Sequence, residues 1–281
     1  MAQVSQRLPA VAGLFYPADP HSLHAQVAGF LASAVPGEVV TAPKAVVVPH
    51  AGYIYSGAVA ASAYSELTRR RDVIRRVLIL CPTHRVYVRG MAVPASQSFV
   101  TPLGAVAVDR DAWLAASALP GVVVDDRPHA EEHAIEVQLP FLQSTLDHFT
   151  ILPIAVGDAE PQQVAAVLEA LWGGPETLIV ISSDLSHYHS YRQAQFHDQA
   201  TIAQIRQLDA TLDGEQACGA NAINGLLLAA RRHHLTPHLL DLRNSGDTAG
   251  DRSRVVGYAS FSFTEGVRDA APAASLGEVA P

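Results

Sequence analysis

The sequence predicts an α/β protein with one large domain, in which a mostly parallel central sheet is flanked by helices. Apolar, β-branched runs alternate along the chain with longer segments whose apolar residues recur at helical spacing. This alternation favours parallel strands, which are buried on both faces and therefore read as continuous apolar runs. At 281 residues, 49% of them hydrophobic, the chain is long enough to bury a large core.

Strands and helices are expected in alternation. The predicted strands are residues 45–49, 77–81, 151–156, 178–181 and 255–263, which are rich in Val, Ile and Leu. The predicted helices are residues 56–70, 131–146, 161–172, 191–208 and 221–233, which are rich in Ala, Leu, Gln, Glu and Arg. Residues 97–109 carry a Pro-Leu-Gly turn between β-prone runs and predict a hairpin attached to the main sheet.

The domain prediction covers residues 1–264. Residues 265–281 are rich in Ala, Pro, Gly and Glu without periodicity, so we predict a disordered tail. The first twenty residues lack a basic segment followed by an apolar run, which predicts a cytoplasmic protein without an export signal. No uninterrupted apolar run is long enough to predict a membrane span.

Charge and cysteine content narrow the classes of partner. The net charge of -8 disfavours nucleic acid and anionic membranes, because both are bound through basic surfaces. Cys81 and Cys218 are far apart in sequence and form no CxxC motif, which argues against a disulfide scaffold or a structural zinc knuckle. The composition therefore favours a small-molecule substrate or a peptide ligand.

Polar side chains follow three of the predicted strands. His50 comes after the first strand, His84 after the second, and Asp184 and His187 after the strand at residues 178–181. In open α/β sheets, ligands bind beyond the carboxyl ends of the strands, so these side chains are expected to meet in one crevice. Imidazoles joined by a carboxylate or thiolate suit iron, zinc or copper. The sequence thus predicts a metal site.

Several motifs resemble those of the Memo family in order and spacing. They are PHAGYIYSG (49–57), CPTHR (81–85), EEHAIEVQLPFLQ (131–143), SSDLSHY (182–188) and CGANAI (218–223), together with AGLFYPAD (12–19) and NSGDTAGDRSRVVGYASF (244–261). The resemblance covers nearly all of the chain except the tail. Bacterial members are described as protein B of the AmmeMemoRadiSam system, which implies a radical SAM protein and an AMMECR-type protein as partners.

The Memo family is similar in fold to class III extradiol dioxygenases, which hold non-heme Fe(II). The resemblance implies that His50, His84 and Cys218 bind the metal, with Asp184 and His187 in the same pocket as catalytic residues. The dioxygenases use two His and a Glu, so Cys218 is a departure from their ligand set. A thiolate is softer than a carboxylate and favours copper or zinc, so Fe(II), Cu and Zn are all candidates.

The resemblance implies either an oxidoreductase acting on a small molecule or a non-catalytic protein that binds metal or a peptide. Asp184 is a candidate acceptor for a histidine ring N–H, or a fourth ligand. His187 is a candidate general base or hydrogen-bond donor. Cys218 precedes a predicted helix, whose dipole would lower the pKa of the thiol.

Five more residues are expected around the pocket. Phe15 and Tyr53 are predicted to supply its walls. Glu132, His133 and Glu136 are predicted to orient the loops beneath it.

A competing interpretation is a zinc hydrolase. His129, Glu132 and His133 match the H-x-x-E-H pattern, in which two histidines one helical turn apart bind zinc and the glutamate acts as a base. Pro128 places His129 in the first turn of the predicted helix. This pattern requires one continuous helix through both histidines.

Overall fold

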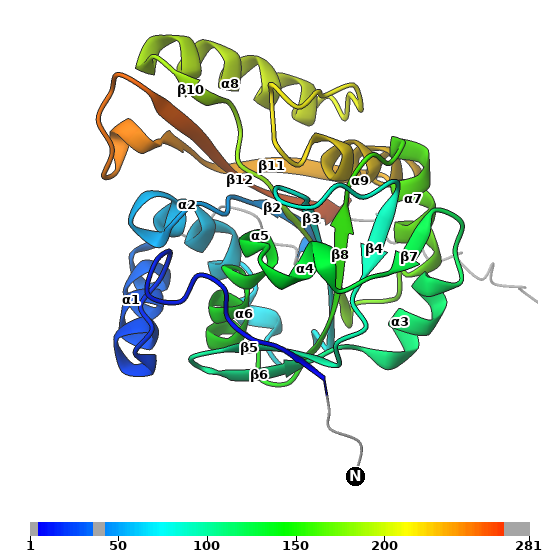
Figure 1. Cartoon of the computed structure of the whole chain (residues 1–281). Helices are drawn as coiled ribbons and strands as arrows, with labels where there is room; N and C mark the ends of the chain where they lie inside the picture. Colours follow the sequence, from blue (N-terminus) through cyan, green and yellow to red (C-terminus); the bar gives the residue numbers. More distant parts are fainter. Residues whose placement is uncertain (1–4, 36–42, 267–281) are drawn as a thin grey trace, which may run out of the picture.

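In the computed structural model, which describes residues 5–35 and 43–266, the chain folds around a nine-stranded mixed sheet (Figure 1). Its centre is parallel and runs in the order β2 (Pro43–Val48), β9 (Thr177–Ser182), β3 (Arg76–Pro82) and β8 (Thr150–Val156). These four strands are buried almost throughout. The α/β class and the apolar central strands predicted from the sequence are therefore confirmed.

The two flanks of the sheet contain antiparallel pairs. On one side, β4 (Met91–Val93) runs antiparallel to β8 and parallel to β7 (Val122–Val124). On the other side, β12 (Val255–Glu265) runs antiparallel to β2, β11 (Leu235–Asn244) and β10 (His187–His189). The parallel arrangement expected for most of the sheet is thus confined to its centre and the β4–β7 pair.

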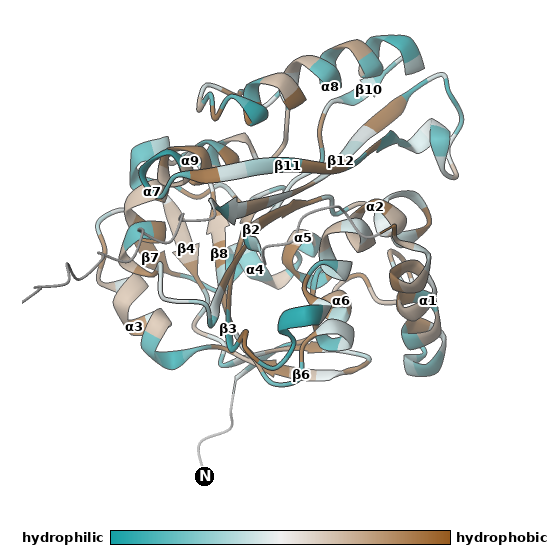
Figure 2. Ribbon diagram, turned by 180° about the vertical axis from the view of Figure 1, so that it is seen from behind, coloured by the Kyte–Doolittle hydropathy of each residue, from teal (hydrophilic) through white to brown (hydrophobic). Residues whose placement is uncertain are grey.

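Helices cover both faces of the sheet, as Figures 1 and 2 show. α7 (Pro161–Ala170) and α9 (Ala220–Arg232) pack on one face, where α3 (Arg110–Ser117) lies beside them. On the other face lie α1 (Pro20–Ser33), α2 (Tyr53–Ser65) and α6 (Leu139–Thr145). α8 (Tyr191–Arg206) packs on β10, β11 and β12. Alternate residues of the central strands enter the two apolar clusters, as a two-residue side-chain period requires.

The hairpin predicted at residues 97–109 is present, but in a separate sheet. β5 (Ser98–Thr101) and β6 (Gly104–Ala107) pair antiparallel, and β5 also pairs with β1 (Gln6–Arg7). β6 lies against β8, and Val108, the residue after β6, forms an isolated bridge to Ile151. The N-terminal segment is thereby held close to the loops that follow the central strands.

The single helix predicted over residues 131–146 is wrong. The structure has α4 (Arg127–Ala130), α5 (His133–Glu136) and α6, separated by short breaks. Glu132 adopts an extended conformation, and its carboxylate accepts a hydrogen bond from the Ala134 amide at the start of α5. Capping of this kind ends one helix and begins another. The break changes the direction in which His133 points.

Two other features complete the description. The 3-10 helix Thr68–Arg70 follows α2 in the chain, and Ser245–Asp247 forms a second 3-10 turn between β11 and β12. The predicted tail lies outside the described residues except for Glu265, the last residue of β12, and Gly266. Within the part of the chain that the structure describes, no helix is long and apolar enough to cross a membrane.

Candidate metal centre

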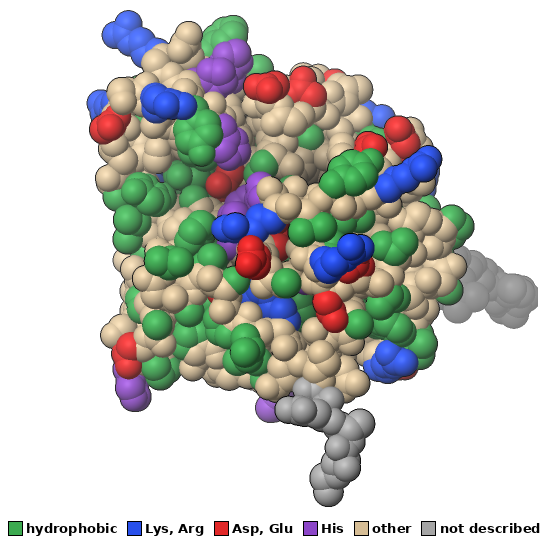
Figure 3. Space-filling model, viewed as in Figure 1, with side chains coloured by type: hydrophobic (Ala, Val, Ile, Leu, Met, Phe, Trp, Pro, Cys, Tyr) green, Lys and Arg blue, Asp and Glu red, His purple; other side chains and the backbone are tan. Residues whose placement is uncertain are grey.

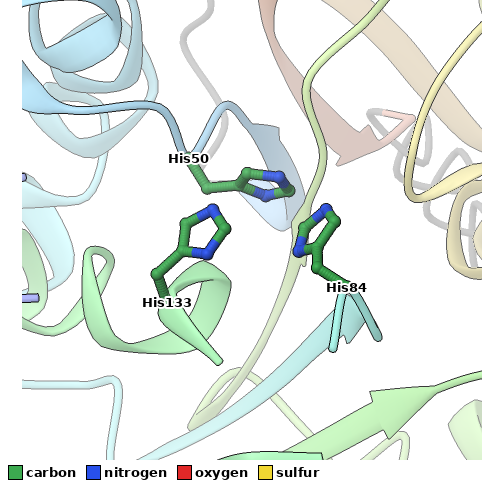
Figure 4. A group of neighbouring side chains, drawn as sticks. All are labelled: His50, His84 and His133. Atoms are coloured by element: carbon green, nitrogen blue, oxygen red, sulfur yellow. The ribbon is translucent and has the colours of Figure 1, made fainter. Parts of the chain in front are cut away.

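Three histidine side chains converge at the carboxyl edge of the parallel strands. His50, His84 and His133 each offer a ligand atom, and these atoms lie within 4.8 Å of one another. The His84 ring centroid is 5.2 Å from that of His50 and 4.9 Å from that of His133. Figure 4 shows the three rings facing a common centre.

The sheet topology explains why these side chains meet. β2 and β3 both pair in parallel with β9, so their carboxyl ends lie at the same edge. His50 and His84 each follow one of these strands by two residues. His133 is the first residue of α5, which packs against β3. The site therefore depends on three segments that are distant in sequence.

A buried serine orients the His50 ring. The hydroxyl of Ser182 donates to the carbonyl oxygen of Ala134 at 2.7 Å and accepts from Nε2 of Gln138 at 2.9 Å. Because a serine hydroxyl has one proton, His50 Nδ1, 2.9 Å from Ser182 Oγ, must donate its own. Gln138 is held in this orientation because its Oε1 accepts from the Tyr64 hydroxyl. The lone pair of His50 is thus on Nε2.

Glu132 orients the His84 ring and lies near the His133 ring. Its Oε1 lies 2.9 Å from His84 Nδ1 and 3.3 Å from His133 Nδ1, while Oε2 accepts from the backbone amide of His84 at 2.8 Å. A carboxylate that holds the Nδ1 proton leaves Nε2 as the metal-binding atom. Burial raises the pKa of Glu132, but the hydrogen bonds and charge of His84 outweigh it and lower that pKa to about 2.

The three imidazoles differ in their preferred protonation state. Burial lowers the pKa of His50 to about 3 and that of His133 to about 4, so both are neutral near pH 7. Burial also lowers the pKa of His84, but the hydrogen bond and charge of Glu132 raise it above its usual value. Converging imidazoles, two of which have Nδ1 held by an acceptor, fit a zinc, copper or iron ion.

Cys218 lies at the side of this cluster. Its Sγ is 3.3 Å from His50 Nε2 and accepts from the Asp184 backbone amide at 3.3 Å, but it is not among the atoms that lie within 4.8 Å of one another. The expectation of a lowered thiol pKa is wrong. Burial and the nearby charge of Asp184 raise the pKa of Cys218 to about 12, which outweighs its position just before α9.

Asp184 and His187 occupy different surroundings. The Asp184 side chain is buried, and its Oδ1 accepts from the backbone amide of His50 at 2.7 Å. The acceptors for the ring N–H groups are Ser182 and Glu132, so Asp184 does not have the ring-acceptor role considered for it. His187 is partly exposed at the start of β10, and its ring packs against Tyr188.

The two predicted wall residues are placed differently from each other. The ring centroid of Phe15 is 4.7 Å from that of His133, so Phe15 lies beside the cluster. Tyr53 packs instead in the core, where its ring contacts Tyr16 and Phe141 and its hydroxyl donates to the Val137 carbonyl. Helix α2 begins at Tyr53 and turns this side chain inward.

Glu136 anchors the N-terminal segment. It is fully buried, is paired with Arg7, and accepts from the backbone amides of Ala10 and Val11 and from the Tyr16 hydroxyl. These bonds fix the loop that carries Phe15. Glu136 thus orients a loop beside the cluster rather than a histidine within it.

The zinc-hydrolase pattern is not assembled. His129 lies in α4, is 1% exposed, and its Nε2 is 3.1 Å from the Ala92 carbonyl oxygen. The chain is extended at Glu132, so His129 and His133 do not lie one turn apart on one helix. Only His133 of this pair joins the cluster.

Sequence reasoning placed His133 beneath the pocket and overlooked Ser182 and Gln138. The adjacent glutamate in Glu132-His133 was a usable signal, since ligand histidines are commonly held by carboxylates. Ser182 is the last residue of β9, and nothing in the sequence marks its hydroxyl as the partner of His50.

Alanine at Ser182 is expected to weaken metal binding by roughly 10–100-fold, because His50 Nδ1 loses its acceptor and the ring is free to change tautomer. A competition titration with a chromophoric chelator measures the affinity. The ¹⁵N shifts of His50 in the metal-free protein report the tautomer directly. Ser182→Thr, which keeps the hydroxyl, and Ser144→Ala, whose hydroxyl bonds only within α6, serve as controls. An unchanged tautomer in Ser182→Ala would contradict the assignment.

Known proteins resemble this chain over most of its length. The family model described as Memo-like protein matches residues 7–262. MEMO1 family proteins from Sulfolobus acidocaldarius and Aquifex aeolicus are each 35% identical over 92% of this chain, covering 99% and 98% of their own lengths. One from Methanopyrus kandleri is 36% identical over 93% of this chain and 100% of its own. A crystal structure of an uncharacterized protein from Escherichia coli K12 has a TM-score of 0.49 and 12% identity, over 77% of this chain and 98% of that one.

Proposed function

Because this chain belongs to the Memo-like protein family, we propose that it binds one redox-active metal ion, iron or copper, at His50, His84 and His133, and acts as an oxidoreductase on a small molecule. The observation that carries the proposal is the convergence of three imidazoles, with Nδ1 of His50 held by Ser182 and Nδ1 of His84 held by Glu132. Three protein ligands leave coordination positions for a substrate. A bound iron or copper ion would supply one-electron chemistry.

The protein's own residues would exchange protons with a substrate and shape the surroundings of the metal. His187, partly exposed at the start of β10, is our candidate for exchanging a proton with a substrate. Asp184 holds the His50 backbone in place, and burial raises the pKa of its carboxyl group, so a proton is retained there more readily than on an exposed aspartate. Phe15 shields one side of the His133 ring from water.

A second candidate is a non-catalytic metal-binding protein of the AmmeMemoRadiSam system, with a radical SAM protein and an AMMECR-type protein as partners. The position of Cys218 supports it, since Sγ lies 3.3 Å from His50 Nε2. A thiolate added to the imidazoles would favour copper or zinc and would complete a four-ligand site. In that candidate function Cys218 would be the fourth donor, with its thiol proton lost to solvent when a metal is bound.

Elemental analysis of protein purified anaerobically without chelator tests the proposal. We expect a stoichiometric amount of iron or copper. A protein that lacks metal and takes up neither added iron(II) nor copper would contradict it. Oxygen consumption with a panel of small phenols and carboxylates then separates the two candidates, because only the oxidoreductase turns a substrate over.

A further inference from the structure

A cavity of about 610 Å³ lies beside the histidine cluster. It is lined by the N-terminal segment, including Leu14 and Phe15, by Glu131 in the link between α4 and α5, and by Arg85. Phe15 belongs both to this cavity and to the cluster, since its ring packs on His133. Arg85 follows His84 directly in the chain. Figure 3 shows histidine side chains at the surface of this face beside Arg or Lys and Asp or Glu side chains.

The two arginines that line this cavity differ in whether their hydrogen-bond donors are already used. Arg7 is 5% exposed, and its guanidinium is used by the His129 and Glu132 carbonyls and by Glu136. Arg85 is 59% exposed in its side chain and has one ion-pair partner in residues 5–35 and 43–266, Glu131, at 3.6 Å. This separation is too long for a hydrogen bond. The donors of Arg85 are therefore available to a ligand.

The apolar side of the cavity is exposed to water. Leu14 directly precedes Phe15 in the chain and is 80% exposed. Its side chain is free to cover an apolar ligand. A ligand that places an apolar group against Leu14 and Phe15 would remove this surface from water, and its charged end would lie toward Arg85. The volume is within the range of small-molecule sites.

We propose that this cavity binds a small monocarboxylate with an apolar body, and that Arg85 recognises its carboxylate by displacing the side chain of Glu131. Arginine matches a carboxylate with two parallel hydrogen bonds. The carboxylates of Glu131 and Asp126 also line the cavity, so a ligand with one negative charge is repelled less than a dianion such as phosphate. The presence of this carboxylate site does not depend on the proposed function. Only the statement that its ligand is the substrate of the metal centre rests on that function.

Benzoate and its neutral isostere benzamide are suitable probes. Calorimetry on the full, metal-loaded chain is expected to show benzoate binding at least about tenfold more tightly than benzamide, as charge-assisted hydrogen bonds imply. Arg85→Gln should weaken benzoate by about tenfold or more and leave benzamide unchanged. Glu131→Gln should strengthen benzoate, because it removes the competing carboxylate. Arg127→Gln, at an exposed pair with Asp125 outside the cavity, should have no effect.

Two results would overturn the inference: no binding of benzoate to the native protein, or equal benzoate affinity in the native and Arg85→Gln proteins. Metal content is measured on every sample. Arg85-dependent benzoate binding in a protein that cannot take up metal would support the carboxylate site while contradicting the proposed function. Metal binding without any benzoate binding would support the proposed function while contradicting the carboxylate site.

Discussion

Alanine at His50 is expected to lower metal affinity by more than about 100-fold, because even residues that only hold a ligand in place cost 10–100-fold when changed. His50 is 2% exposed, and its Nε2 is the atom directed at the cluster. The same loss is expected for His84→Ala and His133→Ala. Elemental analysis and chelator competition measure it on protein shown to be folded by circular dichroism.

Three further variants make this experiment selective. His148→Ala removes an exposed histidine and should keep the metal. His129→Gln should also keep it, because His129 does not join the cluster. Cys218→Ser distinguishes the two possible sets of metal ligands. A smaller loss of metal in Cys218→Ser than in His133→Ala supports three imidazole ligands with a neighbouring thiol. Full loss in Cys218→Ser together with retention in His133→Ala would instead support His50, His84 and Cys218.

Methionine at Arg7 is expected to lower the free energy of unfolding by about 3–5 kcal/mol, because it leaves Glu136 as a buried and uncompensated charge. Both side chains are almost fully buried. Arg7 also donates to two backbone carbonyls, which lose their partner in the variant. Urea unfolding followed by circular dichroism measures the change, with the slope of the transition confirming that the folded state stays compact.

The matched control for Arg7→Met is Arg71→Met. Arg71 pairs with Asp147 at 2.7 Å, but both side chains are exposed, so the loss should be below about 1 kcal/mol. Adding Glu136→Gln to Arg7→Met removes the stranded charge and should recover part of the lost stability. A loss in Arg7→Met no larger than that in Arg71→Met would show that the buried pair is not needed.

The central strands could be predicted from sequence because burial on both faces leaves a continuous apolar run, as in residues 77–81 and 178–181. β11 could not, since its residues TPHLLDLR lack the β-branched pattern and reach the sheet through pairing with β12. Its partly exposed residues carry little periodic signal. Tertiary pairing, rather than local preference, makes this segment a strand.

The residues of the site could also be predicted only in part. His50 and His84 follow strands at the carboxyl edge, where general topology places ligands. His133 was expected near the pocket but not in the cluster, because its position depends on the extended conformation of Glu132, whose carboxylate is hydrogen-bonded to His84 and Ala134. The lowered thiol pKa expected at Cys218 is absent for a related reason, because burial among distant residues outweighs the adjacent helix.

The position of β12 has a consequence for how the protein is made. Residues Phe261 to Thr264 pair with β2 on one side, and the same stretch pairs with β11 on the other. During synthesis, β2 therefore keeps one open, β-branched edge long after it has emerged, and such edges pair readily with other chains. Because His50 follows β2 by two residues, we expect the histidine cluster to reach its final geometry only once β12 has paired with β2.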